Sequence, residues 1–501
     1  MSKRLIIILA VAFMLGLSLA AYAEVQNVKV SGDILMRAIS RSDLTLNPDV
    51  NKYKASGITS QVRVRVDADL TDNVSTTIRL LNERSWGDQL NPMDAVLTDE
   101  GVDVGDPWDI SSPYADSSWL GSEDFEIDLA YVTLKEFLYS PLTLTIGRQE
   151  LRFGNALIIG DVDTNMLSNS FAIPLDLSLK KSFDAIRATL DYTPWVLDLV
   201  YSKIAEHDVW WATNLYNNRP HGEMERNDTD LYGINASLDT KNALGIEGKL
   251  DLYYWLRRNL YGNSMWDGNY KKDECNTIGA LLTGKILKNL TGNIEYAWQF
   301  GYVPYDITYM NDDNAKRQAF AIQGGLNYMI QSEKYKDKSP MVGIKYTYLS
   351  ADNKADGKAT MWDPMFEDQT PNNLVNAMFP NTGTQNINIL GSIKPTEDTT
   401  LAINYGYYWL SKKPKDNGVI PAIYGSSPSS EWTLWNNDGK RALGSALDLT
   451  ATYDYTEDVQ FGLTFGMFAP GKALKDAEYG SHPDGYEGTA TQLIGSMKVT
   501  F

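Results

Sequence analysis

The feature that most constrains this chain is an alternation of apolar and polar residues, repeated in segments of about ten residues or more. Over 61–70, every even position is apolar, whereas every odd position is polar or charged. The same period returns at 293–300 and at 401–409. A period of two is typical of a β-strand whose two faces meet different surroundings. Strands of this length favour a membrane barrel over an ordinary β-sandwich.

The connections between these segments alternate between long and short along the whole chain. We predict eighteen strands, at 27–40, 59–70, 73–83, 125–135, 142–152, 183–192, 195–205, 229–239, 245–257, 274–287, 290–301, 316–330, 340–350, 383–394, 399–411, 440–454, 459–468 and 490–501. Outer-membrane barrels have short periplasmic turns and longer extracellular loops. The sequence therefore predicts an all-β fold, a single transmembrane antiparallel β-barrel of about 18 strands with short periplasmic turns and long extracellular loops.

The two-faced strands also explain why the sheet is expected to close. Inside hydrocarbon every backbone N–H and C=O group needs a partner, so an open sheet edge is not tolerated. A mean hydropathy of −0.31 excludes the alternative of a bundle of transmembrane helices. A barrel of this size has a lumen too wide for side chains alone to fill, which predicts a water-filled channel unless loops plug it.

The N-terminus has the pattern of an export signal. Lys3 and Arg4 precede an apolar run, and Ala21-Tyr22-Ala23 fits a small-residue cleavage site. The alternative is a single anchoring helix, but the apolar run is short for a membrane span. We therefore expect residues 1–23 to be a signal peptide cleaved near Ala23, and residues 24–501 to form the barrel in the outer membrane of a Gram-negative bacterium.

The C-terminal segment supports the same location. Leu493, Met497, Val499 and the terminal Phe501 share one face of the last predicted strand, whereas Lys498 lies on the other. A final aromatic residue on an outward face resembles the signal read by the outer-membrane assembly machinery. The expected partners are therefore the outer-membrane lipid and, through Phe501, that assembly machinery.

The polar face of the strands supplies the predicted wall of the lumen, which is rich in arginine. Arg37, Arg63, Arg65 and Arg79 lie on the first three strands, and Arg187, Arg257 and Arg317 follow. A guanidinium group presents a planar set of donors that suits carboxylate or sulfate, and basic rings in pores favour anions. The alternative is that these arginines pair with carboxylates of the wall, such as Asp67, Asp69, Asp128 or Asp198.

Catalytic, metal-binding and nucleic-acid-binding patterns are not found in the sequence. The histidines His207, His221 and His482 fall in long connections, and Cys275 is the only cysteine. The sequence has no phosphate-binding glycine loop, no His-Glu-x-x-His motif and no nucleophile elbow. The formal charge of −19 disfavours nucleic acid. We predict no enzyme activity, no cofactor, no metal site and no nucleic-acid partner.

Two stretches resemble the alginate-export family of outer-membrane channels. The first runs from Ala130-Tyr131-Val132 to Thr145-Ile146-Gly147-Arg148-Gln149-Glu150-Leu151-Arg152-Phe153-Gly154 and on to Phe183-Asp184-Ala185-Ile186-Arg187; the second comprises 444–449 and 465–471. The resemblance implies an eighteen-stranded monomeric barrel that carries an anionic exopolysaccharide outward through an arginine-rich constriction. It adds Arg148 and Arg152 to the predicted pathway. Arg148 shares its face with apolar residues, so it reaches the lumen only if the strand bulges near Gly147, or if it lies above the membrane.

The predicted function is an outer-membrane channel or porin that passes an anionic saccharide, such as an anionic polysaccharide, or a similar small polar solute. The predicted pathway residues are Arg37, Arg63, Arg65, Arg79, Arg148, Arg152 and Arg187. A general or cation-selective porin is an alternative, favoured by ten acidic residues within 84–124. A barrel that sheathes a protein partner and an outer-membrane enzyme that uses the loop histidines are further alternatives.

Overall fold

The fold is taken from a computed structural model. It describes residues 27–44, 46, 54–86, 125–162, 175–177, 182–205, 229–245, 247–261, 271–303, 315–352, 358–413, 418–421, 431–434, 439–476 and 487–501. The predicted signal peptide, the acidic stretch 87–124 and the three histidines lie outside these residues. Among the described residues, no helix is both long enough and apolar enough to cross a membrane.

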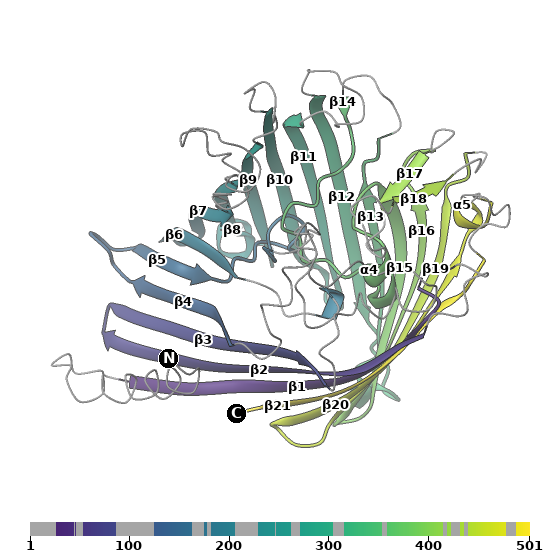
Figure 1. The fold of residues 1–501 in the computed structure, drawn as a ribbon. Coiled ribbons are helices and arrows are strands. Elements are labelled where there is room, and N and C mark those ends of the chain that lie inside the picture. The colour runs from purple at the N-terminus through teal and green to yellow at the C-terminus, as the bar shows by residue number, and fades with distance from the viewer. Residues whose placement is uncertain are drawn as a thin grey trace, which may run out of the picture.

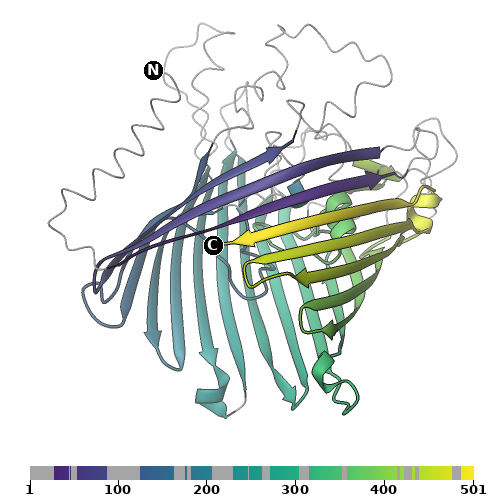
Figure 2. The same cartoon turned by 90° about the horizontal axis from the view of Figure 1, so that it is seen from below.

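Eighteen antiparallel strands form one closed barrel (Figures 1 and 2). They are β1 (Asn27–Ser42), β2 (Lys54–Thr71), β3 (Val74–Ser85), β4 (Glu126–Leu134), β5 (Leu142–Gln149), β6 (Phe183–Tyr192), β7 (Trp195–Ala205), β8 (Thr229–Asp239), β9 (Gly248–Tyr261), β10 (Lys271–Leu287), β11 (Leu290–Val303), β12 (Ala315–Met329), β13 (Met341–Leu349), β15 (Thr384–Thr396), β16 (Thr399–Leu410), β19 (Ala442–Asp454), β20 (Val459–Pro470) and β21 (Ala490–Thr500). Each pairs with the next, and β1 also pairs with β21. The predicted fold class is confirmed.

The seam between the first and last strands is completed by the terminal residue. Residues Asp33 to Ser42 of β1 pair with Thr500 to Thr491 of β21. Beyond this ladder, the N–H of Gly32 donates to the carbonyl of Phe501 at 2.8 Å, and the N–H of Phe501 donates back at 3.0 Å. A Cβ atom at position 32 would lie 2.6 Å from Cζ of the Phe501 ring. Glycine at position 32 therefore makes room for the terminal aromatic side chain.

The structure differs from the prediction mainly in the long connections. The short strands β14 (Lys358–Ala359), β17 (Gly418–Pro421) and β18 (Glu431–Leu434) were not predicted. Helices α4 (Asn373–Met378) and α5 (Lys472–Lys475) also lie in long connections, and α3 (Thr240–Leu244) lies in the turn before β9. In addition, β2 starts at Lys54 rather than 59, because its whole extension pairs with β1 as far as Ser42.

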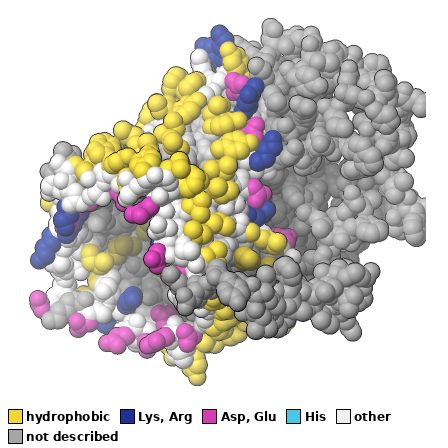
Figure 3. All heavy atoms as spheres, turned by 90° about the vertical axis from the view of Figure 1, so that its left-hand side faces the viewer, with side chains coloured by type: hydrophobic (Ala, Val, Ile, Leu, Met, Phe, Trp, Pro, Cys, Tyr) yellow, Lys and Arg dark blue, Asp and Glu magenta, His cyan; other side chains and the backbone are white. Residues whose placement is uncertain are grey.

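The outer face of the barrel carries the apolar residues. Exposed apolar side chains on this face include Val30, Ile58, Ile78, Ile146, Ile186, Leu199, Ile234, Leu252, Ile278, Ile294, Ile344 and Ile403. Figure 3 shows this apolar surface and, on the same view, a hollow in which charged side chains are visible. Tyr192 and Trp195, both exposed, stand at the short-turn end between β6 and β7. This distribution is that of a wall facing lipid, with aromatic residues at an interface.

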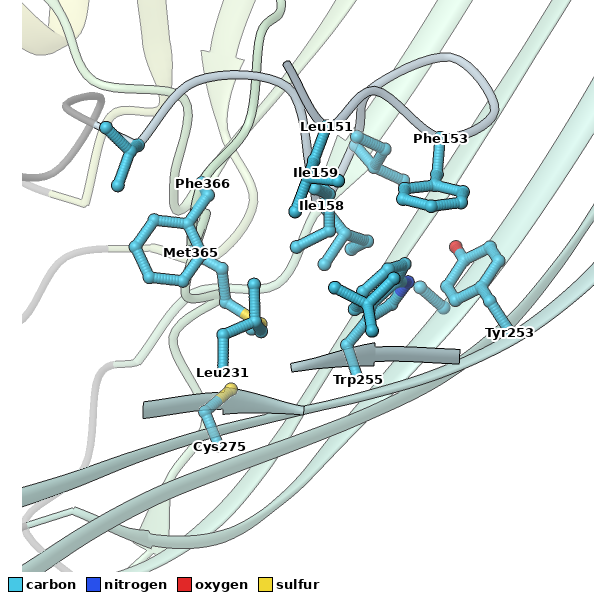
Figure 4. Close-up of a cluster of buried hydrophobic side chains, with 14 of the residues drawn as sticks. Leu151, Phe153, Ile158, Ile159, Leu231, Tyr253, Trp255, Cys275, Met365 and Phe366 are labelled. Atoms are coloured by element: carbon cyan, nitrogen blue, oxygen red, sulfur yellow. The ribbon is translucent and has the colours of Figure 1, made fainter. Parts of the chain in front are cut away.

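Part of the lumen is filled by two connections that fold inward. The first inward segment, 151–162, follows β5, and the second, 360–382, lies between β14 and β15. They join through a parallel bridge between Ile159 and Phe366. Both pack on inward side chains of β6–β13 in one apolar cluster, which includes Leu151, Phe153, Leu231, Trp255, Cys275, Met365 and Phe366 (Figure 4). Gly233 admits the Trp255 ring, since a Cβ atom there would overlap it at 1.9 Å.

A second apolar cluster lies under α4 and α5. It joins Leu44 and Leu46, which follow β1, to Leu374 and Met378 of α4, Leu474 of α5 and Phe468 of β20. The Phe379 and Phe468 rings lie 5.4 Å apart between centroids. The side chain of Asn372 caps α4 by accepting from the N–H groups of Leu374 and Val375. These contacts fix the end of the second inward segment to the wall.

Candidate functional site

Two of the predicted arginines line the wall of β2 and stay partly exposed. Nε of Arg63 donates to Asp33 at 2.8 Å, and Nε and Nη2 of Arg65 both donate to Asp67 at 2.8 Å. The side chains of Arg63 and Arg65 remain 23% and 35% exposed. Both guanidinium groups are therefore paired with wall carboxylates, yet they still present part of their surface to the lumen.

Arg79 of β3 has a different environment, because it is buried. Its Nε donates to Asp128 at 2.5 Å, and its Nη2 donates to Glu150 at 2.6 Å. Asp128 also accepts from the hydroxyl of Ser182 at 3.2 Å. Since Glu150 directly precedes the first inward segment, Arg79 fixes the start of that segment to the wall rather than facing a solute.

Arg37 also holds a connection in place. Its Nη1 donates to the carbonyl of Leu177 and to Oε1 of Gln61, both at 2.7 Å. The neighbouring Arg41 is buried and forms an ion pair with Asp176. Leu177 and Asp176 belong to the short helix η2 (Leu175–Leu177), which these contacts hold against the inside of β1 and β2. Sequence reasoning placed Arg37 on the wall but did not foresee this partner, which is distant in the chain.

Arg187 of β6 is held between the wall and the first inward segment. Its Nε donates to Asp198 at 2.8 Å, and its Cζ atom lies 5.1 Å from the centroid of the Phe153 ring. Thr189 donates to the same carboxylate at 2.7 Å. The Arg187 side chain remains 33% exposed. This arginine is thus oriented by contacts on two sides and keeps a polar edge toward the lumen.

Arg148 does not line the lumen, which corrects the prediction for this residue. Its register partners are Ala130 and Asp184, both exposed, and its Nη1 lies 3.5 Å from the Asp184 carboxylate. Gly147 has a φ of +122°, but the chain around it keeps Ile146 exposed on the outer face. The irregularity at Gly147 therefore does not turn the following side chain inward.

Arg152 is displaced from the predicted strand, because β5 ends at Gln149. It lies in the first inward segment, where it forms an ion pair with Asp368 of the second inward segment. The Arg152 side chain is 52% exposed, the highest value among the predicted pathway arginines. It therefore combines a role in joining the two segments with an accessible guanidinium group.

A buried ion network anchors the second inward segment. Arg257 donates to Asp363 at 2.7 and 3.0 Å, and Arg317 lies 3.0 Å from the same carboxylate. Both arginines also contact Asp273 of β10. Burial alone would raise the pKa of the Asp363 carboxyl, but the two guanidinium groups hold that pKa well below its usual range. Sequence analysis placed the arginines on the wall and missed Asp363, which it assigned to a loop.

A second acidic residue of the same segment, Glu367, is also buried. Nδ2 of Asn381 donates to Oε1 of Glu367 at 2.7 Å. Burial raises the pKa of Glu367 to about 8, against the opposing effects of the Asn381 hydrogen bond and the Lys345 charge. Among the described residues, no group of histidine, cysteine and acidic side chains is arranged to hold a metal ion. The arrangement is thus one of fixed inward segments beside a partly exposed arginine wall.

Comparison with known proteins identifies the family. The sequence model for alginate export matches residues 27–484, nearly the whole chain. The chain belongs to the alginate export family. This confirms the resemblance read from the segments around Gly147 and Phe183. The comparison with curated proteins finds no match.

Solved structures resemble this alginate export family member in fold. The crystal structure of Pseudomonas aeruginosa OccK3 (OpdO) is 8% identical, has a TM-score of 0.50, and the match covers 96% of this chain and 97% of that one. The outer membrane protein OpdK from Pseudomonas aeruginosa is 9% identical with a TM-score of 0.49, covering 94% and 99%. Family and fold together identify an outer-membrane barrel of the channel type.

Proposed function

We propose that this outer-membrane channel passes an anionic saccharide or a similar polar anion, and that it has no enzyme activity. The observation that carries the proposal is the set of partly exposed guanidinium groups of Arg63, Arg65, Arg152 and Arg187. A guanidinium group has five N–H donors, and the ion pairs described above use at most two of them. The remaining donors are available to a carboxylate or sulfate that passes along the wall.

The inward segments support this proposal because they narrow the space beside the arginine wall. Both segments pack on β6–β13, whereas Arg63 and Arg65 lie on β2. The ion network of Asp363 keeps the second segment in place. A solute is thereby brought close to the guanidinium groups, where fixed charge acts more strongly than in the open lumen of a wide pore.

A porin with little charge selectivity is the second candidate. It is favoured by the pairing of each wall arginine with a carboxylate, namely Arg63 with Asp33, Arg65 with Asp67 and Arg187 with Asp198. Such pairs carry no net charge. The two candidates therefore differ in one measurable quantity, the ratio of anion to cation permeability.

The test is the reversal potential across a planar bilayer under a salt gradient. The double variant Arg63→Gln/Arg65→Gln is expected to shift this potential toward cation selectivity. The matched control is Arg148→Gln/Arg258→Gln, which removes the same charge from the outer face. An anion-selective parent channel, blocked by uronate oligosaccharides but not by neutral ones of the same length, supports the proposal. A parent channel without selectivity, or equal shifts in both variants, overturns it in favour of the porin.

A further inference from the structure

Six charged side chains form one row across the outer face of the barrel. They are Arg148 on β5, Asp184 on β6, Lys203 on β7, Asp230 on β8, Arg258 on β9 and Glu274 on β10. Each lies directly opposite the next in the strand register. The signs alternate along the whole row, which is visible beside the apolar surface in Figure 3. Alternation over six strands therefore places charges of both signs in one row that follows the strand register.

The contacts within the row are loose. The nitrogen–oxygen distances are 3.5 Å from Arg148 to Asp184, 3.4 Å from Lys203 to Asp230 and 3.7 Å from Arg258 to Glu274. These exceed the usual length of a charge-assisted hydrogen bond, about 2.7–2.9 Å. The three basic side chains remain 35%, 31% and 42% exposed. The cations are thus held in position by neighbouring carboxylates while part of each side chain remains exposed.

On β5 to β8 the row marks the long-loop end of the apolar surface. On each strand, the neighbouring outward-facing residue on the short-turn side of the row is apolar or aromatic. These residues are Ile146 on β5, Ile186 on β6, Tyr201 on β7 and Tyr232 on β8. The hydroxyl of Tyr201 donates to Asp230 at 3.1 Å, so this ring lies in the apolar surface with its polar end at the row. Aromatic residues with this orientation are typical of a membrane interface.

Within the row, the height of Lys203 is close to the edge of an apolar band about 25 Å tall. Lys203 lies eight residues from Trp195, which stands at the short-turn end of the same strand. At about 3.3 Å per residue this is about 26 Å along the strand, or about 20 Å along the membrane normal for a tilt of about 40°. The row lies at the long-loop end of the strands, so it faces the outer leaflet.

We propose that the row binds the phosphate groups of phosphorylated glycolipid headgroups in the outer leaflet. Its cations lie on the outer face of the barrel at the long-loop end of the strands, and guanidinium and ammonium groups are suited to phosphate. Successive cations are two strands apart, about 9.5 Å across the sheet. This spacing lets neighbouring cations contact separate phosphates, while the intervening carboxylates prevent the cations from repelling one another.

The test measures binding of a fluorescent bisphosphorylated lipid A to the purified protein in phosphatidylcholine nanodiscs. The wild-type protein is expected to bind this lipid at least tenfold more tightly than the same lipid without phosphates. The variant Arg148→Gln/Lys203→Gln/Arg258→Gln is expected to lose that preference. The control Lys241→Gln/Lys285→Gln, at the opposite end of the barrel, should keep it. Inorganic phosphate in solution should not displace the lipid.

Two results would overturn the proposal. One is equal binding of the phosphorylated and phosphate-free lipids by the wild-type protein, which requires no variant and so is independent of folding. The other is a triple variant that is folded, as judged by its heat-modifiable mobility on gels, and that binds the phosphorylated lipid as tightly as the wild type does. In either case the charged residues of the row only neutralise one another and do not bind lipid phosphate.

Discussion

The Cζ atom of Arg187 lies 5.1 Å from the centroid of the Phe153 ring, while Nε of the same guanidinium group donates to Asp198 at 2.8 Å. A wall strand and the first inward segment thus orient one arginine together. Cation–π contacts of this kind contribute about 0.5–2 kcal/mol, depending on how far they are desolvated. The contact links the position of the segment to the direction in which a pathway cation points.

We expect Arg187→Gln to lower the free energy of unfolding by about 1–3 kcal/mol, because the buried Asp198 carboxylate loses a charged donor. The measurement is urea unfolding in lipid vesicles. The double variant Arg187→Gln/Asp198→Asn should recover most of that stability. The anion preference of the parent channel should be lost in both the single and the double variant. Full recovery of both properties in the double variant would show that Arg187 acts only through its ion pair.

A second prediction concerns the anchor of the second inward segment. Asp363→Asn leaves the buried Arg257 and Arg317 with one carboxylate fewer, and breaking a buried pair in this way costs about 3–5 kcal/mol. We expect larger fluctuations in single-channel conductance because the segment is released from the wall. The control is Asp337→Asn, the same change at an exposed turn. Identical conductance traces in Asp363→Asn and wild type would contradict the assigned role.

The same carboxylate predicts a pattern of pH dependence. The pKa of Asp363 is lowered in the folded protein, so its contribution to stability is complete above the usual pKa of aspartate and is lost only as the pH falls toward the lowered value. The single-channel conductance of the wild type should therefore remain free of the fluctuations expected for Asp363→Asn in mildly acidic buffer. Onset of fluctuations between pH 6 and pH 5, which is above the usual aspartate pKa of about 3.9, would contradict this assignment.

Glu367 predicts a change with the opposite sign. Its pKa is raised to about 8, so between its ordinary value and pH 8 the folded state binds the proton more tightly than the unfolded state does. The stability of the second inward segment should fall as the pH rises through this range. Protease accessibility of the segment is the measurement, and Glu367→Gln should remove the dependence. An unchanged pH profile in this variant would assign the effect to another group.

The closing seam gives a prediction about assembly. Gly32→Val places side-chain atoms where the Phe501 ring lies, and deletion of Phe501 removes two backbone hydrogen bonds with Gly32. Both changes should reduce the amount of folded barrel in the outer membrane, measured by heat-modifiable mobility. Gly57→Val on β2 is the control, because a Cβ atom there meets nothing within 4 Å. Equal yields of folded barrel from all three variants would show that Phe501 does not contribute to assembly.

The barrel itself was predictable because its determinants are local. The alternating faces of strands such as β2, and the alternation of long and short connections, follow directly from residue order. The wall arginines were predictable for the same reason, since the face of Arg63 or Arg65 is set by its parity. The parity of Arg148 placed it on the same face as its apolar neighbours, and in the structure it lies on that outer face.

The contents of the lumen were not predictable, because they depend on contacts between connections far apart in the chain. Ile159 pairs with Phe366, and Asp363 meets Arg257 across more than a hundred residues. A polar connection has no internal period that distinguishes an exposed loop from one folded inward. The apolar run Leu157-Ile158-Ile159 was the available signal, since three consecutive apolar residues are unusual in an exposed loop.

The seam between β1 and β21 also has a consequence for biosynthesis. The strand β1, made early in translation, finds its second neighbour only when the eleven residues of β21 have been made. Until then the nascent sheet has two edge strands with unpaired N–H and C=O groups. Such edges are unstable in lipid and can pair with other chains. Insertion must therefore wait until β21 has been made, and a chain that stops before β21 leaves one edge of β1 without its partner in the bilayer.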